Sequence, residues 1–254
     1  MARACIFCGS TSKLSGEHIF PDWLSKMFDD RIVGINEVRG DNLARDWVKS
    51  IFQDKLKKVC GACNSGWMST LENDVKNLLL ALIFTHDQVT LDDKNQRLLA
   101  FWAQKTLLVV NEATVGGFSI PKDFYHELYQ QKMPIKNILV NIGWKTTLGG
   151  TKEPNDPLMS FEIKQISQVE VKKDEVKRIH GDIEQGKTVW AATLSLGYIV
   201  FQFFGHNLSG QLEVGMPQDD IFLTISPDGK VVVWPSTLPI EVVGGLASIR
   251  QGMY

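Results

Sequence analysis

The four cysteines of this chain lie in two pairs whose spacing is typical of a metal site. Cys5 and Cys8 form one Cys-x-x-Cys knuckle, and Cys60 and Cys63 form the other. A gap of two residues lets both sulfurs of a turn reach one ion, and two such turns supply the four ligands of a tetrahedral structural zinc site. Buried free thiols and disulfides are the alternatives, but neither explains the paired spacing well. We therefore predict a structural Zn²⁺ held by the four thiolates.

Three segments together resemble the HNH endonuclease family, in its variant with four zinc-binding cysteines. They are Cys5-x-x-Cys8, Glu17-His18-x-x-Pro21 and Val59-Cys60-x-x-Cys63-Asn64, within roughly residues 1–72. The resemblance implies a ββα-metal fold, in which an acidic-His pair ends the first strand and the last metal ligand begins the helix. In several family members that last ligand is Asn, as Asn64 would be here. The activity implied is metal-dependent hydrolysis of DNA phosphodiester bonds.

The chemistry of such a site can be compared with these residues directly. Hydrolysis of a phosphodiester needs a base to activate water and a cation to stabilise the developing charge. His18 suits the first role, because an imidazole is largely neutral at pH 7 and can accept a proton. Glu17 and Asn64 suit the second, as oxygen ligands of a catalytic Mg²⁺ or Mn²⁺. Adjacent strand residues point to opposite faces, so Glu17 and His18 share one site only where the strand is distorted or ends.

Each of these residues also has a plainer interpretation. His18 could be a structural residue beside a zinc knuckle. Asn64 could be a helix N-cap, a role that Asn favours and that is compatible with metal binding. Trp23, Trp67 and Met68 are expected to be core residues rather than a platform for stacking bases.

A basic cluster, Lys55, Lys57 and Lys58, directly precedes the second knuckle. Its plain interpretation is a solvated strand edge, and its functional one is contact with phosphate. The family usually has Asn or His nine positions before the final ligand, where it braces the loop that holds the base. Lys55 occupies that position here, which departs from the family pattern.

Periodicity predicts the elements that position these residues. We expect a short strand and a knuckle turn within 2–12, short strands at 17–20 and 55–59, and a helical segment at 22–28. A long helix should follow Cys63, with one buried stripe to about residue 84. Residues 29–49 have no clear pattern. The fold class predicted is α+β, with a zinc-braced ββα-metal module at 1–88 that includes the long helix, followed by a mixed helix-then-antiparallel-sheet domain at 89–254.

The second domain is predicted to begin with two helices. The first starts with a capping box at Thr90-x-x-Asp93, runs to about Asn111 and has one apolar side, and the second covers 121–131. Strands are expected at 137–146, 160–171 and 188–204, followed by a hairpin of 221–225 and 230–234 around the turn 226–229. The histidines from residue 86 onward lack partners at ligand spacing, so we expect surface or capping roles for His86, His126, His180 and His206.

Composition limits the classes of protein that remain. The chain has 254 residues with 44% hydrophobic and 22% charged, which is typical of a soluble globular protein. The net charge of −2 excludes a polycation, so any contact with nucleic acid must use a local patch. No stretch has the length of a signal peptide or a membrane span, and we expect a cytoplasmic protein with reduced thiols and no membrane contact.

The sequence therefore predicts a metal-dependent HNH-type endonuclease, with DNA as its partner and RNA as the alternative substrate. Such an enzyme could act in restriction, in a phage or in antiphage defence. Residues 89–254 could bind the target, form a homodimer or bind a partner protein. The competing hypothesis is a non-catalytic zinc-binding module that mediates interactions with protein or nucleic acid. The near-neutral net charge and the Lys55 departure favour that competing hypothesis.

Overall fold

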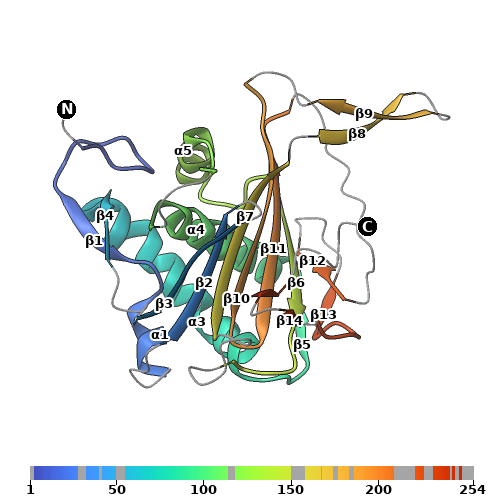
Figure 1. The fold of residues 1–254 in the computed structure, drawn as a ribbon. Helices are drawn as coiled ribbons and strands as arrows, with labels where there is room; N and C mark the ends of the chain where they lie inside the picture. The colour runs from blue at the N-terminus through green and yellow to red at the C-terminus, as the bar shows by residue number, and fades with distance from the viewer. Residues whose placement is uncertain are drawn as a thin grey trace.

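The structure, a computed structural model, places helices on one face of a central sheet and the C-terminal part of the chain on the other (Figure 1). It describes residues 3–27, 33–39, 42–49, 55–113, 118–149, 158–166, 168–173, 177–182, 186–208, 221–225, 231–240, 242–243 and 246–247. The mixture of helices with a mostly antiparallel sheet confirms the predicted α+β class. Among the described helices, none combines the length and the apolar character that crossing a membrane requires.

The described part of the chain contains one large sheet. Its seven strands lie in the order β12-β6-β11-β10-β7-β2-β3, with the bounds Leu223–Thr224, Ile138–Trp144, Ile199–His206, Val189–Leu196, Met159–Ile166, Val33–Arg39 and Asn42–Lys49. Every pair is antiparallel except β2 with β7. The β2–β3 hairpin comes from the segment between the two knuckles, where the sequence showed no clear pattern, and it extends the sheet at the β7 side.

Shorter strand pairs and the helices complete the fold. The pairs are β1–β4 (Leu14–His18, Lys55–Cys60), β5–β13 (Val89–Leu91, Val232–Trp234), β8–β9 (Gln168–Lys173, Lys177–Asp182) and β14–β15 (Val242–Val243, Leu246–Ala247). The helical segments are α1 (Asp22–Met27), α2 (Gly61–Cys63), η2 (Asn64–Met68), α3 (Ser69–Phe84), α4 (Asp93–Ala113) and α5 (Lys122–Gln131).

Helix α3 matches its prediction closely. It buries a single stripe, as the three- and four-residue spacing of its apolar residues requires. The buried residues are Leu71, Val75, Leu79, Leu82 and Ile83.

Helix α4 is buried more completely than predicted. Every residue from Leu99 to Asn111 is buried, whereas the sequence indicated one apolar side. The helix packs between α3 and the sheet, where Trp102 contacts the ring of Phe201 with centroids 5.9 Å apart. A helix enclosed on both sides cannot keep a solvated face. The predicted capping box is also wrong, because Thr90 lies in β5 and Asp92 accepts the capping hydrogen bond from the Asn95 N–H at 2.7 Å.

Four strand predictions are corrected by the structure. Residues 3–13 contain the knuckle turn but no strand, and segment 160–171 is divided between β7 of the large sheet and β8 of the β8–β9 pair. Residues 188–204 form no single strand but the hairpin β10–β11, which turns at Gly197 with a φ of 57°. Segments 221–225 and 230–234 do not pair with each other, since β12 pairs with β6 and β13 pairs with β5. The predicted turn at 226–229 lies outside the described residues.

The main hydrophobic core runs through both predicted domains. One cluster of buried residues contains Val59 and Leu79 from the first part together with Leu107 and Phe203 from the second. The division at residue 88 stays a prediction. The two knuckles therefore pack against the same core as the sheet.

Candidate functional site

The two knuckles meet, and their four sulfurs form a compact cluster. The Sγ atoms of Cys5, Cys8, Cys60 and Cys63 all lie within 4.8 Å of one another, and none of these cysteines is in a disulfide. The first knuckle is a tight turn, in which the Cys5 carbonyl accepts from the Gly9 N–H at 2.9 Å and Gly9 has a φ of 71°. The second begins at the last residue of β4 and continues into α2. The four cysteines could therefore hold a metal ion such as zinc.

The donor set fits a thiolate-binding metal. Three of the four cysteines are buried, and Cys8 Sγ lies 3.6 Å from Cys60 Sγ. Burial raises the pKa of Cys60, but the hydrogen bond from the Cys63 backbone and those from neighbouring thiols more than offset it and bring the pKa to about 7. Burial raises the pKa of Cys63. A bound cation would replace the thiol protons, since the metal binds the thiolate form.

The pair β1–β4 connects the cysteine cluster to the predicted catalytic residues. Leu14 pairs with Cys60 at one end of the ladder and His18 pairs with Lys55 at the other. The register shifts between Ser15 and Glu17, so the strand is distorted just before the acidic-His pair. The strand ends at His18, earlier than Phe20, where the sequence indicated its end. A distorted strand end is the condition under which Glu17 and His18 could share a site.

His18 and Lys55 lie beside each other at the end of this ladder. His18 is half-buried and Lys55 is exposed. The Lys55 stem crosses Gly16, where an added Cβ would lie 3.1 Å from Lys55 Cδ. Lys55, which departs from the HNH pattern, is therefore next to the predicted base.

Asn64 ties the start of the helix to β1. Its Nδ2 donates to Ser15 Oγ at 3.1 Å and to the Gly16 carbonyl at 3.4 Å. Asn64 has helical φ and ψ, and no capping bond from its side chain occurs at the start of α2 or η2. The N-cap interpretation is therefore wrong. Both described bonds use the amide nitrogen, which leaves the oxygen Oδ1 for another partner.

Glu17 points into the protein interior, where it meets a lysine that the sequence analysis missed. Glu17 is 2% exposed, and its Oε1 lies 3.7 Å from the Nζ of Lys105 in α4. The same Nζ lies 2.5 Å from Oε1 of Glu72 in α3. Burial raises the pKa of Glu17 to about 7, although Lys105 acts in the opposite direction. A lone Lys within the apolar run of α4 was the available sequence signal, because a buried ammonium needs a carboxylate partner.

The oxygens that a divalent cation would need can be compared with these contacts. Glu17 Oε2 is buried and has no hydrogen-bond partner among the described residues, so it could ligate a cation. Its other oxygen already faces the Lys105 ammonium. The described contacts join Asn64 to residues 15 and 16 and join Glu17 to Lys105. A shared Mg²⁺ or Mn²⁺ at Glu17 and Asn64 stays a prediction.

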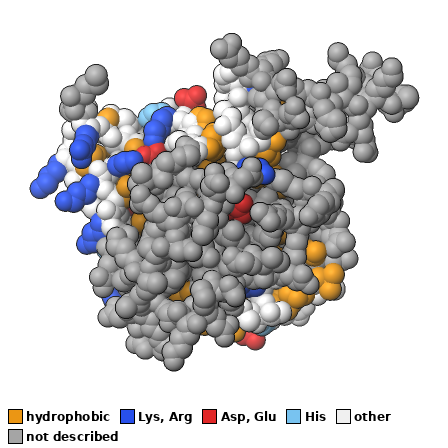
Figure 2. All heavy atoms as spheres, in the orientation of Figure 1, with side chains coloured by type: hydrophobic (Ala, Val, Ile, Leu, Met, Phe, Trp, Pro, Cys, Tyr) orange, Lys and Arg blue, Asp and Glu red, His pale blue; other side chains and the backbone are white. Residues whose placement is uncertain are grey.

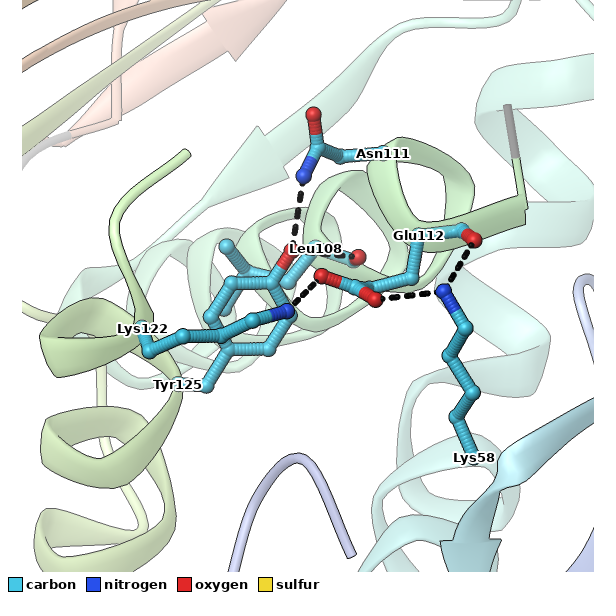
Figure 3. Close-up of polar contacts among 6 residues, drawn as sticks. All are labelled: Lys58, Leu108, Asn111, Glu112, Lys122 and Tyr125. Carbon is cyan, nitrogen blue, oxygen red and sulfur yellow. Dashed lines mark hydrogen bonds and ion pairs between the residues drawn. The ribbon is translucent and has the colours of Figure 1, made fainter. Parts of the chain in front are cut away.

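Basic side chains gather on the side of the molecule where β1 and β4 lie (Figure 2). Lys55 and Lys57 are exposed residues of β4. Lys58 is engaged with α4, because its Nζ lies 2.8 Å from Glu112 Oε2 and donates to the Glu112 carbonyl at 3.1 Å (Figure 3). Lys122 of α5 binds the other oxygen of the same carboxylate. Of the three lysines predicted to contact phosphate, Lys58 is therefore also bound to Glu112 within the protein.

The aromatic residues near the knuckles and the four histidines from residue 86 onward complete the set of residues considered in the sequence. The aromatic residues near the knuckles pack as expected, with the rings of Trp67 and Phe101 stacked at 5.6 Å. His206 is buried, contrary to the expected surface or capping role, and burial lowers its pKa. His86 and His126 are exposed, and the His180 side chain lies outside the described residues. His126 is nevertheless held by the first knuckle, since its Nδ1 lies 2.8 Å from the Phe7 carbonyl.

No protein-family model matches this chain, and neither a curated protein nor a solved structure matches it, so its function has to be argued from the geometry of the site.

Proposed function

We propose that this chain is a metal-dependent endonuclease of the HNH type, with zinc as a structural ion at the four cysteines. Support comes from the order of the elements, in which the antiparallel pair β1–β4 is followed at once by a helix. Asn64 lies at the start of that helix and is bonded to β1. The four cysteines lie at the base of the same unit.

The observation that carries the proposal is the pairing of His18 with Lys55 at the end of the ladder away from the cysteines. His18 would accept the proton of the attacking water. The Lys55 ammonium would lie against a phosphate oxygen and help to fix the substrate. Mg²⁺ or Mn²⁺, when bound by Glu17 and Asn64, would stabilise the charge that develops on the phosphate and the leaving oxygen.

A second candidate function is a zinc-braced binding module without catalysis. The burial of Glu17 and its approach to Lys105 favour it, because a carboxylate in an internal ion pair is poorly available to a hydrated cation. On this hypothesis the Glu17–Lys105–Glu72 cluster only fixes β1 and α3 to α4. The two hypotheses differ in whether His18 does chemistry.

Cleavage of supercoiled plasmid in Mg²⁺ or Mn²⁺ tests the proposal. We expect nicked or linear product from the wild type and a loss of roughly 100-fold or more in rate for His18→Ala, as is usual when a general base is removed. His86→Ala is the matched control, since His86 is exposed just beyond the C-terminal end of α3. Equal rates for the wild type and His18→Ala, or no product from zinc-replete wild type on DNA and RNA, would favour the binding module.

A further inference from the structure

The carboxylate of Glu112 joins α4, α5 and strand β4, which ends at Cys60, at one point. Its side chain is only 6% exposed, yet Lys58 and Lys122, which bind it, are 48% and 54% exposed at their side chains. Burial alone would raise the pKa of Glu112, but the hydrogen bonds from Lys122 and Lys58 more than offset it and lower the pKa. One carboxylate therefore holds two ammonium groups at the surface, which leaves a net positive charge.

One flank of α5 continues this positive region along the first knuckle. His126 follows Lys122 by four residues and Tyr129 follows His126 by three, so these side chains share a flank of the helix. His126 contacts the knuckle through the Phe7 carbonyl, and the Ile6 N–H donates to the Lys58 carbonyl at 3.0 Å. These contacts link β4, the knuckle and α5 into one continuous surface.

Lys132 extends the surface to the second knuckle. It is the C-cap of α5, with a left-handed φ of 52°. Its Nζ lies 3.3 Å from the ring centroid of Tyr129 and 4.7 Å from that of Trp67, the fourth residue after Cys63. These rings fix the ammonium beside the cysteine cluster while the residue remains exposed. We name Lys58, Lys122, His126 and Lys132 the basic strip.

The charge around the strip is positive although the whole chain is slightly acidic. Seven exposed cations lie on the knuckles, β4 and α5: Arg3, Lys13, Lys55, Lys57, Lys58, Lys122 and Lys132. The described acidic residues of the same surface are Glu112, Asp123 and Glu127. Among the residues that the structure describes here, positive charge remains in excess even with the −2 charge of a zinc held by four thiolates. Figure 2 shows the gathering of Lys and Arg on the side of β1 and β4.

We propose that the basic strip binds the sugar-phosphate backbone of a nucleic acid, so that α5 is part of the substrate-binding surface. The inference rests on the proposed function, because the bound strand would be the one presented to His18. Lys58 lies three residues along β4 from Lys55, or about 10 Å at the rise of a strand. Lys122 to Lys132 spans about 15 Å at the rise of a helix. Contacts from these ammonium groups to phosphates would carry no sequence information, so we expect binding that is independent of sequence.

Binding of a 20-base-pair DNA duplex, followed by fluorescence anisotropy, tests this inference. The protein carries His18→Ala, which prevents cleavage without touching the strip. Lys122→Gln and Lys132→Gln should each weaken binding roughly fivefold near 0.15 M salt and lower the salt slope by about 1, as expected for one lost phosphate contact. Lys94→Gln is the matched control, because this exposed lysine lies at the other end of α4, about 27 Å from Glu112 by helical rise.

The outcomes separate this inference from the proposed nuclease. Unchanged affinity and salt slope in the Lys122→Gln/Lys132→Gln double variant would overturn the strip, even if plasmid cleavage depends on His18. Weaker binding in the double variant with unchanged zinc content and melting temperature would support the strip, whether or not cleavage is seen. A fall in melting temperature would point to the Glu112 contacts instead, and Lys132→Gln alone, which leaves those contacts intact, would then decide. RNA of the same sequence serves as the second probe, because its backbone offers the same phosphates.

Discussion

At the scale of single residues, the buried Lys105 decides how Glu17 can act. Its ammonium has no exposed surface and lies between two carboxylates from different elements, Glu17 of β1 and Glu72 of α3. With both carboxylates ionised, the cluster would carry a net negative charge inside the core. The raised pKa of Glu17 shows how the cluster avoids this, since burial favours its protonated form near neutral pH.

Replacing Lys105 with Met should destabilise the protein by about 3–5 kcal/mol, because it leaves buried carboxylates without their cation. Urea denaturation measures the loss as a lower midpoint. Lys94→Met provides the control, as the same substitution at an exposed position of the same helix. Adding Glu17→Gln to Lys105→Met should recover part of the loss. If the double variant is no more stable than the single one, the two side chains are not coupled.

At the scale of elements, the β10–β11 hairpin depends on one glycine that touches α3. A Cβ at Gly197 would lie 2.4 Å from the Ile83 carbonyl oxygen, and the Gly197 φ of 57° is one that other residues rarely adopt. The Tyr198 N–H donates to the same Ile83 carbonyl at 3.0 Å. The turn of the hairpin is thus bonded to the C-terminal end of the helix.

Gly197→Ala should therefore cost more stability than the left-handed backbone alone explains. The backbone term is about 1–2 kcal/mol for a residue with a Cβ, and the clash with backbone adds to it. Gly186→Ala isolates the backbone term, because Gly186 has a φ of 83° and no atom within 4 Å of an added Cβ. Thermal melts of the two variants give the comparison. Equal losses would mean that the turn moves away from α3 at little cost.

The same elements show which parts of the fold the sequence could predict. Helix α3 was predictable because its stripe repeats within one local segment. The sequence predicts β10 and β11 as one strand because every residue of both strands is buried. No change from buried to exposed residues marks the turn at Gly197 in the sequence. Strands β12 and β13 pair with β6 and β5, partners distant in the chain, and the local turn residues between them carry no information on that choice. The Lys105–Glu17 contact could not be predicted either, because its partners are distant in the chain. The spacing of the cysteines, in contrast, was enough to predict that the two knuckles meet.

At the scale of the whole molecule, the cysteine cluster and the sheet share one hydrophobic core. Cys5, Cys60 and Cys63 are themselves members of the cluster that includes Leu107 of α4 and Phe201 of β11. The packing of α3 and α4 connects the knuckles to the sheet. A change at the cysteine cluster should therefore affect the stability of residues far along the chain from the knuckles.

Removing zinc tests this coupling. We expect one zinc per chain, and a chelator or Cys60→Ser should lower the melting temperature of the entire protein, because the ion supplies folding free energy to a core that both parts share. Calorimetry should show one transition with and without the metal, since α4 is buried against both parts. The control is the same chelator already saturated with zinc. A melt that splits into two transitions, of which only one responds to zinc, would instead establish residues 1–88 as a unit that folds independently. The basic strip, which combines Lys58 with residues of α5, would then be a surface formed between two domains.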